Sequence, residues 1–159
     1  MNYKLENQVF NRLISLEKTI SSAESFTGGQ FISKFTRIPG ASKICQGSMI
    51  TYSNKSKKTL LNIKQEEIKE FGVVSKEIAL KMVLESKNIF NSNISISFTG
   101  NAGPDTIENK PKGLFFIGFA FEEVSFVKKY YQPKLKRDEI ISFAIDEANK
   151  TIMEYLKNI

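Results

Sequence analysis

Ser25 is the residue of this sequence best placed to act as a nucleophile. It lies in the segment 23–29, AESFTGG, between a β-branched run at Thr19 and Ile20 and a helix-like stretch. Glycines let a ligand approach backbone N–H groups that the first turn of a helix leaves unpaired, and the helix dipole favours negative charge there. Ser25 is therefore a candidate nucleophile whose oxyanion adjacent main-chain donors would stabilise. The same pattern is equally typical of an ordinary serine N-cap.

A serine nucleophile in this chain needs a base other than histidine, because the sequence contains none. Lys, Tyr, Asp and Glu are the remaining choices. Lys57 could serve only if burial and its positive neighbours Lys55 and Lys58 lower its pKa from the ordinary ~10.4. On the residues alone, the simpler interpretation is an exposed lysine on a short basic helix. Tyr52 either orients Lys57 or relays a proton, or is a half-buried tyrosine at the end of a strand.

Composition restricts the partners that this chain can have. The net charge of +6 comes from dispersed lysines, and arginine occurs only at positions 12, 37 and 137, so nucleic acid is an unlikely partner. The apolar run 113–121 is far too short to span a membrane, and residues 1–18 lack a secretory apolar segment, so we expect a cytoplasmic protein.

Cys45 is the only cysteine. It has no histidine or second thiol for a metal site, and we expect a small buried apolar side chain.

The elements that must position these residues follow from periodicity, capping residues and turn residues. The predicted helices are residues 1–18, 30–36, a short helix capped by Ser53 or Asn54, 65–71, a helix from Ser75 to Phe90, and 138–156. The predicted strands are residues 19–23, 44–52, a segment around 94–98, 113–121 and 125–131, the last two joined as a hairpin across Glu122 and Glu123. The β-α units and the hairpin predict the α/β class: a single three-layer α/β/α domain with a mixed sheet. A chain of 159 residues without a linker or repeat fits one domain, 1–159.

Seven blocks of the sequence resemble the C-terminal domain of CinA, in the family's order. The segment around Ser25 resembles the family signature AESCTGG. The other blocks are IPGAS at 38–42, TYSN at 51–54 with Lys57, LLNI at 60–63, FGVVS at 71–75, TGNAGP at 99–104 and KPKG at 110–113. The resemblance covers the chain from about Leu5 to Leu156. It implies the CinA C-terminal-like fold and a homodimer or larger assembly.

This family includes stand-alone nicotinamide-nucleotide amidohydrolases, so the resemblance also implies an activity. The expected reaction converts nicotinamide mononucleotide, an anionic small molecule, to nicotinic acid mononucleotide and ammonia, without a metal or other cofactor. Lys57 falls on the family's dyad lysine, so Ser25 would attack the amide and Lys57 would carry the proton. We expect Tyr52 to assist and N–H groups near residues 26–28 to hold the oxyanion. The predicted substrate-binding residues are Glu24, Phe26, Thr27, Gly28, Gly29, Thr99, Gly100, Lys110 and Arg137. For Glu24 we favour a structural role, and Arg137 could equally be an exposed residue at a helix start.

The sequence departs from the family near the expected substrate. Phe26 replaces the family's usual cysteine, and the loop 105–109 lacks the usual glycine pair. Residues 131–136 replace the aromatic-x-Gly pattern that the family has before its last helix, and Ile141 stands where the family has a second arginine. Because Ser25 and Lys57 are kept, we expect the dyad to persist with altered substrate affinity or preference. The alternative is a non-catalytic CinA-like domain that senses nucleotides or binds other proteins.

Overall fold

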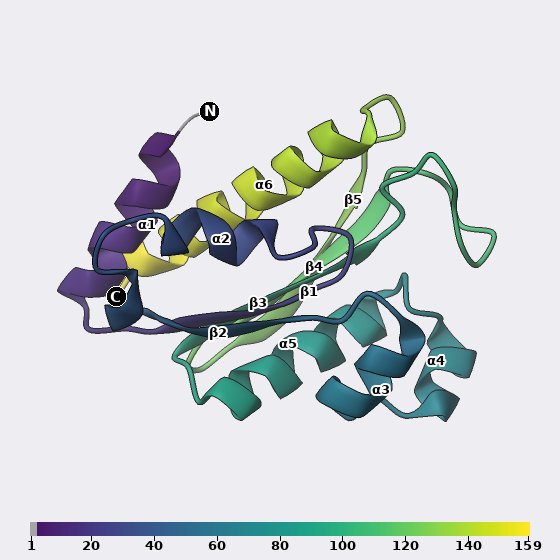
Figure 1. Ribbon diagram of the computed structural model, residues 1–159, viewed down its shortest axis with the longest axis horizontal. Helices are drawn as coiled ribbons and strands as arrows, with labels where there is room; N and C mark the ends of the chain where they lie inside the picture. The colour runs from purple at the N-terminus through teal and green to yellow at the C-terminus, as the bar shows by residue number, and fades with distance from the viewer. Residues whose placement is uncertain (1–2) are drawn as a thin grey trace.

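A computed structural model describes residues 3–159, and its centre is a five-stranded mixed sheet (Figure 1). The strands are β1 (Ile20–Glu24), β2 (Cys45–Ile50), β3 (Ile94–Gly100), β4 (Leu114–Ala120) and β5 (Ser125–Tyr131), in the order β2-β1-β3-β4-β5. β1 is parallel to β2 and β3, whereas β4 is antiparallel to β3 and β5. The predicted hairpin is therefore confirmed.

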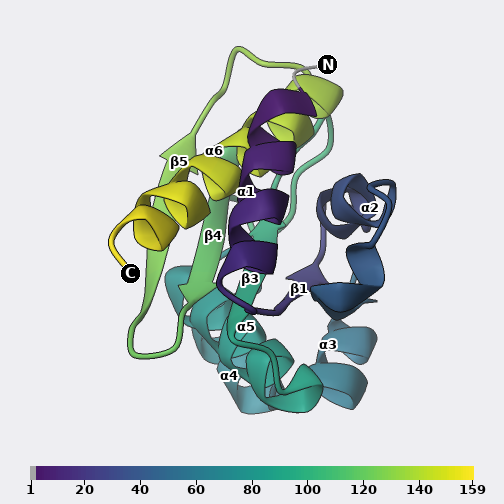
Figure 2. The same cartoon turned by 90° about the vertical axis from the view of Figure 1, so that its left-hand side faces the viewer.

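Helices cover both faces of this sheet, which confirms the predicted α/β/α layers. α1 (Tyr3–Ser15), α2 (Gln30–Thr36) and α6 (Arg137–Lys157) lie on one face, and Figure 2 shows α1 beside α6. α3 (Asn54–Leu61), α4 (Gln65–Phe71) and α5 (Lys76–Phe90) lie on the other. The predicted helix over 1–18 is shorter, and residues 1 and 2 lie outside the described part. No helix among residues 3–159 has the length and apolar character that crossing a membrane requires.

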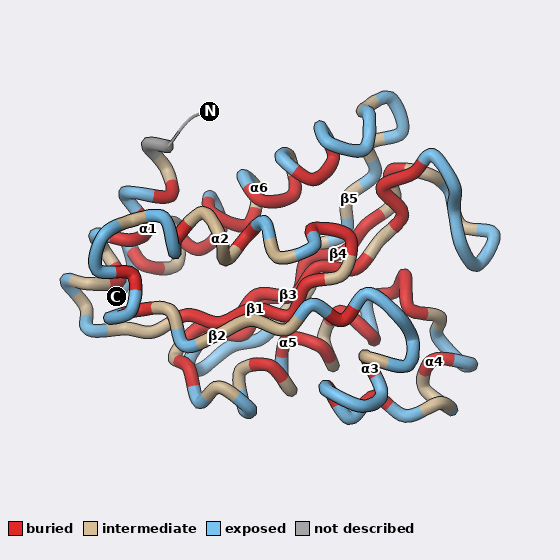
Figure 3. The backbone as a smooth tube through the Cα atoms, in the orientation of Figure 1, coloured by how far each residue is buried: buried red, intermediate tan, exposed pale blue. Residues whose placement is uncertain are grey.

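The middle strands are buried, and helices cover both of their faces (Figure 3). The side chains on each face must therefore find apolar contacts or hydrogen bonds within the protein. On β3, Ile94, Ile96 and Phe98 enter the larger core beneath α1, α2 and α6. The alternate residues face α5, and there Ser97 Oγ donates a hydrogen bond to the Ala79 carbonyl at 2.6 Å. Thr99 Oγ1 donates similarly to Val73 O at 2.6 Å. Strand alternation thus places apolar groups against one layer and satisfied hydroxyls against the other.

Cys45 differs from its prediction as a buried residue. It is only partly buried, at the start of the edge strand β2, and it packs against the rim of the larger core. Partial burial still raises the pKa of its thiol to about 11, because the thiolate would lose hydration. A nucleophilic role for this thiol is therefore disfavoured at neutral pH.

Candidate active site

Ser25 lies directly after β1, at the carboxyl ends of the two central parallel strands. Its N–H donates a hydrogen bond to the Phe98 carbonyl of β3 at 3.0 Å, which fixes its backbone to the sheet. Residues 25–29 then form a turn, with Gly28 and Gly29 at φ of 57° and 90°. This left-handed conformation suits glycine, because a β-carbon would crowd the backbone. The turn delays the start of α2 to Gln30, so Ser25 does not cap that helix.

The Glu24 carboxylate occupies the N-terminus of α2, which corrects the prediction that this end is free for a ligand. The carboxylate is fully buried and accepts hydrogen bonds from the N–H groups of Gly29, Phe31 and Ile32 at 3.0–3.2 Å. Thr27 Oγ1 donates to the same carboxylate at 2.7 Å. Glu24 and Thr27 therefore hold the turn, which agrees with the structural role favoured for Glu24, whereas the substrate-binding roles also predicted for the two side chains do not fit this geometry.

Lys57 reaches Ser25 from the opposite side of the turn. Ser53 caps α3, its hydroxyl accepting the Ser56 N–H at 3.0 Å, and this sets the helix so that Lys57 points inward. The Lys57 residue is only 1% exposed. Its Nζ donates to the Thr51 carbonyl at 2.6 Å and to Ser25 Oγ at 3.3 Å. The interpretation of Lys57 as an exposed surface lysine is therefore wrong.

Burial lowers the pKa of Lys57 from 10.5 to about 8. The cause is desolvation, because the charged ammonium loses more hydration free energy on burial than the neutral amine does. The negative charge of Glu108 partly opposes this change and raises the pKa. Lys55 and Lys58 are exposed and are not among the causes, so the predicted contribution of positive neighbours is wrong. About a tenth of Lys57 is therefore uncharged at pH 7 and about half near pH 8, and this neutral form is able to accept a proton.

Tyr52 pairs with Arg137, not with Lys57. The Tyr52 side chain is 60% exposed, and its hydroxyl accepts a hydrogen bond from Arg137 Nη2 at 2.7 Å. Arg137 Nη1 donates to the Gly103 carbonyl at 2.7 Å. Among residues 3–159, no hydrogen bond joins Tyr52 to Lys57, and the amine is oriented by the Thr51 carbonyl instead. The predicted role of Tyr52 in orienting Lys57 is therefore corrected, whereas Arg137 does lie at the site.

A hollow of about 190 Å³ opens beside Ser25. Its lining residues are Ser25, Phe26, Tyr52, Gly100, Asn101, Ala102, Gly103, Asp105, Ile107 and Arg137. The Phe26 ring is almost fully buried and packs against the rings of Phe98 and Phe115, with centroids 6.3 and 5.5 Å away. Phe26 therefore forms an apolar wall next to the nucleophile instead of projecting into solvent.

Four other predicted substrate-binding residues lie elsewhere. Thr99 is buried against α5 with its hydroxyl bonded to Val73 O. Lys110 lies on the far side of its loop, where Nζ donates to Val74 O at 2.6 Å. Gly28 and Gly29 line a separate hollow between α2 and β2. Strand alternation and loop direction, which spacing in the sequence does not reveal, separate these residues from Ser25.

The main-chain donors near Ser25 are fewer than predicted. The Gly28 N–H donates to the Ser25 carbonyl at 3.0 Å, and the Gly29 N–H donates to Glu24. Within residues 3–159, the N–H groups of Phe26 and Thr27 have no recorded hydrogen-bond acceptor. These two N–H groups therefore have no partner in the described fold, and of the two residues Phe26 lines the hollow.

The predicted site residues do not include five that line the hollow, Asn101, Ala102, Gly103, Asp105 and Ile107, or Thr51 beside it. Thr51 supplies the carbonyl that holds the amine. Asn101 braces the loop over the hollow, since Nδ2 donates to the carbonyls of Ile107 and Lys110 at 3.2 and 3.1 Å and Oδ1 accepts the Ile107 N–H. Asn101 lies inside a recognised sequence block, so that block was the available signal. Thr51 acts through its backbone carbonyl, so the type of its side chain could not indicate this role in the sequence.

The functional groups at the site are of the kinds used in nucleophilic chemistry. Across residues 3–159, no three His, Cys, Asp or Glu side chains are grouped closely enough to bind a metal ion. The site instead combines a hydroxyl, a buried amine, two free main-chain donors and one guanidinium. This combination is suited to attack on the carbonyl of an anionic substrate.

Comparisons with known proteins agree on one family. A family model described as the CinA C-terminal domain matches residues 2–156. A protein of Listeria innocua named for competence-damage induction is 50% identical over 105 residues, 65% of this chain and 25% of that protein. A CinA-like protein of Petrotoga mobilis is 44% identical over 126 residues, 79% of this chain and 31% of that protein. The chain therefore spans about a quarter to a third of the length of these relatives.

A solved structure supports the fold independently. The crystal structure of a CinA superfamily protein from Klebsiella pneumoniae superposes with a TM-score of 0.94. The superposition covers 100% of this chain and 99% of that one, at 19% sequence identity. At this identity the likeness concerns the fold alone.

Proposed function

Because the chain belongs to the CinA C-terminal domain family, we propose that it is an amidohydrolase that converts nicotinamide mononucleotide to nicotinic acid mononucleotide and ammonia. The observation that carries the proposal is the buried Lys57 Nζ, 3.3 Å from Ser25 Oγ. A lysine whose pKa is lowered to about 8 is a competent base for a serine hydroxyl in a chain without histidine.

In the first half of the proposed reaction, Ser25 Oγ attacks the carboxamide carbon. Neutral Lys57 takes the hydroxyl proton while the Thr51 carbonyl keeps the amine in place at 2.6 Å. The carbonyl oxygen becomes negatively charged, and the N–H groups of Phe26 and Thr27 are the donors available to stabilise it. The tetrahedral intermediate collapses when protonated Lys57 gives its proton to the amide nitrogen, so that ammonia leaves and an acyl-serine remains.

In the second half, water replaces ammonia. Lys57, neutral again, removes a proton from a water molecule that attacks the acyl carbon. The same donors hold the oxyanion, and the proton returns to Ser25 Oγ as nicotinic acid mononucleotide is released. Every proton that moves is carried by one amine, so the only co-reactant is water.

The substrate's phosphate and pyridine ring fit different parts of the hollow. Arg137 is the one cation lining it, and its fork-shaped guanidinium is suited to a phosphate. The exposed ring of Tyr52, bonded to Arg137 at 2.7 Å, offers a flat surface at the mouth. The hydrogen bonds of Arg137 to Tyr52 and Gly103 use two of the five guanidinium N–H groups, so others remain for a phosphate.

Ammonia release from nicotinamide mononucleotide tests this proposal. We expect release by the wild type, and a loss of roughly 10³-fold or more in Ser25→Ala and Lys57→Met. Lys58→Met, which removes an exposed lysine from the same helix, should keep wild-type activity. No release by the wild type would remove the proposed function, and equal release by the wild type and Ser25→Ala would remove its mechanism.

One observation favours a second candidate, a nucleotide-sensing domain without catalysis. Ile141 stands where the family has a second arginine, and it is 7% exposed within the larger apolar core. The site therefore has one cation fewer for an anionic substrate. Binding of the mononucleotide by calorimetry, without ammonia release, would support this alternative.

A further inference from the structure

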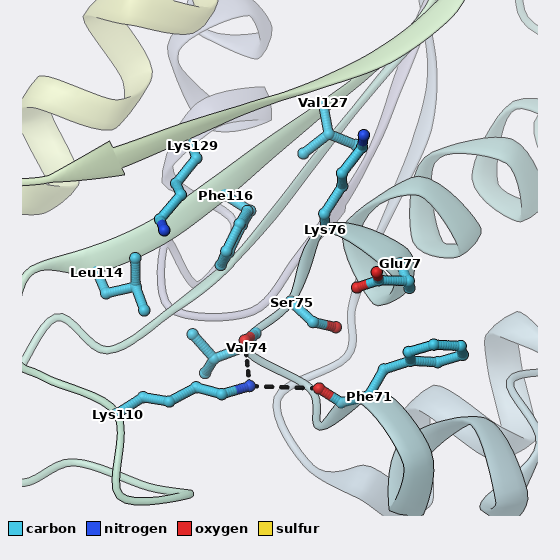
Figure 4. Close-up of a pocket in the computed structure, with 10 residues that line it drawn as sticks. All are labelled: Phe71, Val74, Ser75, Lys76, Glu77, Lys110, Leu114, Phe116, Val127 and Lys129. Carbon is cyan, nitrogen blue, oxygen red and sulfur yellow. Dashed lines mark hydrogen bonds between the residues drawn. The ribbon is translucent and has the colours of Figure 1, made fainter.

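A third hollow, of about 480 Å³, lies on the face of the sheet that α5 covers (Figure 4). This hollow borders the smaller apolar core on the α5 side of the sheet, not the larger core on the other face. It shares no lining residue with the hollow beside Ser25. Its size is within the range of small-molecule sites, ~300–1,000 Å³. A molecule bound here would not occupy the Ser25 hollow. The two sites are linked through Glu108, which contacts Lys110 in this wall and whose charge acts on Lys57.

The floor of this hollow is apolar. Phe116 of β4 and Val74 are buried there, and the half-buried Leu114 and Val127 of the hairpin continue the surface. The Phe71 ring, 37% exposed at the end of α4, closes one side. Two aromatic rings and three aliphatic side chains thus give a surface on which a ring system can be desolvated.

The rim of the hollow is cationic. Lys76 of α5, Lys110 of the 101–113 loop and Lys129 of β5 come from three separate elements, and Figure 4 shows all three around the apolar floor. Glu77 is the only acidic residue in the lining. The rim therefore carries an excess of positive charge over a floor that excludes water.

The three lysines differ in whether their ammonium groups already have partners within the protein. Lys110 Nζ is already held by Val74 O at 2.6 Å, Phe71 O at 3.3 Å and the Glu108 carboxylate at 3.1 Å. In contrast, no carboxylate of residues 3–159 lies within 4 Å of the ammonium of Lys76 or Lys129. Lys110 therefore builds the wall, and Lys76 and Lys129 keep their charges for an external anion.

We propose that this hollow binds an organic anion with an aromatic body, the rings on Phe116 and Val127 and the anionic group at Lys76 or at Lys129, which Figure 4 shows on opposite sides of Phe116. An inorganic anion would leave the apolar floor exposed, and a neutral aromatic molecule would leave both ammonium groups without a counter-charge. Only a molecule with both features uses the whole site.

Fluorescence titration with anilinonaphthalene sulfonate, an aromatic anion, tests the proposal on the full chain in its folded state. We expect one saturable site, with affinity reduced about threefold in Lys76→Ala or Lys129→Ala and about tenfold in the double variant. Glu77→Gln should change affinity in the opposite direction, by about twofold. Uncharged phenylnaphthylamine should bind more weakly than the sulfonate.

Matched controls separate this site from general charge and from the Ser25 hollow. Lys43→Ala removes an exposed lysine from the short helix before β2, and Arg137→Ala removes the cation beside Ser25. Both should bind the sulfonate as the wild type does. The proposal is overturned if the wild type does not bind it, if the double variant binds equally well, or if Arg137→Ala loses binding to the same extent.

Discussion

Replacing Lys57 by methionine tests the buried amine without relying on any catalytic assay. Methionine keeps an unbranched side chain of similar length and removes the charge. In the folded protein the pKa of Lys57 is lowered from 10.5 to about 8 by burial. The unfolded chain holds this proton more tightly, so the stability of the wild type must rise with pH between these two values.

The magnitude follows from the gap between the two pKa values. At about 1.36 kcal/mol per pH unit, protonation of the buried amine destabilises the fold by roughly 3 kcal/mol at pH 7, below both values. At pH 10 the remaining penalty is under about 1 kcal/mol, because the folded protein is then deprotonated and pH 10 lies only about half a unit below the unfolded pKa of 10.5. Wild type should therefore gain roughly 2.5 kcal/mol relative to Lys57→Met between pH 7 and pH 10.

Urea unfolding of both proteins at several pH values measures this difference. Other groups that titrate in this range are common to both proteins and cancel. The Thr51 carbonyl loses its donor in Lys57→Met, which shifts the variant's stability by a similar amount at every pH. Lys58→Met, on the exposed side of the same helix, should follow the wild-type curve. Parallel curves for wild type and Lys57→Met would refute the lowered pKa.

Two further predictions concern the carboxylates around the site. Glu24→Gln should destabilise the fold by about 3 kcal/mol, because an amide group cannot accept all the N–H donors at the start of α2. Thermal unfolding should show a drop of roughly 6–12 °C, and no drop beyond that of the exposed control Glu123→Gln would contradict the structural role. Glu108→Gln should lower the pKa of Lys57 below about 8, since the Glu108 charge raises it. The lysine NMR signal that disappears in Lys57→Met reports this value, and an unchanged or higher titration midpoint would contradict the prediction.

Most of the secondary structure could be predicted from local patterns. The Ser75 hydroxyl accepts the Ile78 N–H and starts α5, and Ile78, Ala79, Met82 and Val83 form its buried stripe, as their spacing indicates. The alternation of β3 likewise predicted a strand. These signals are local because helix caps and side-chain periodicity depend on neighbours in the chain.

The candidate site was predictable in part. The blocks around Ser25 and Lys57 pointed to the right loops, since the carboxyl ends of parallel strands meet at one edge of a sheet. The same reasoning wrongly included Thr99 and Lys110. Both belong to the correct segments, but their side chains bond to Val73 O and Val74 O on the α5 side of the sheet.

The sequence by itself determined which functional groups exist: a serine after a strand, no histidine, and a lysine on a short predicted helix. Only the tertiary structure decided what those groups can do. Desolvation of Lys57 requires segments distant in the chain to exclude water together, and Glu24 became a helix cap because its carboxylate was buried beside unpaired N–H groups. A side chain's pKa and partners depend on what surrounds it in space, and residue type and spacing do not specify those surroundings.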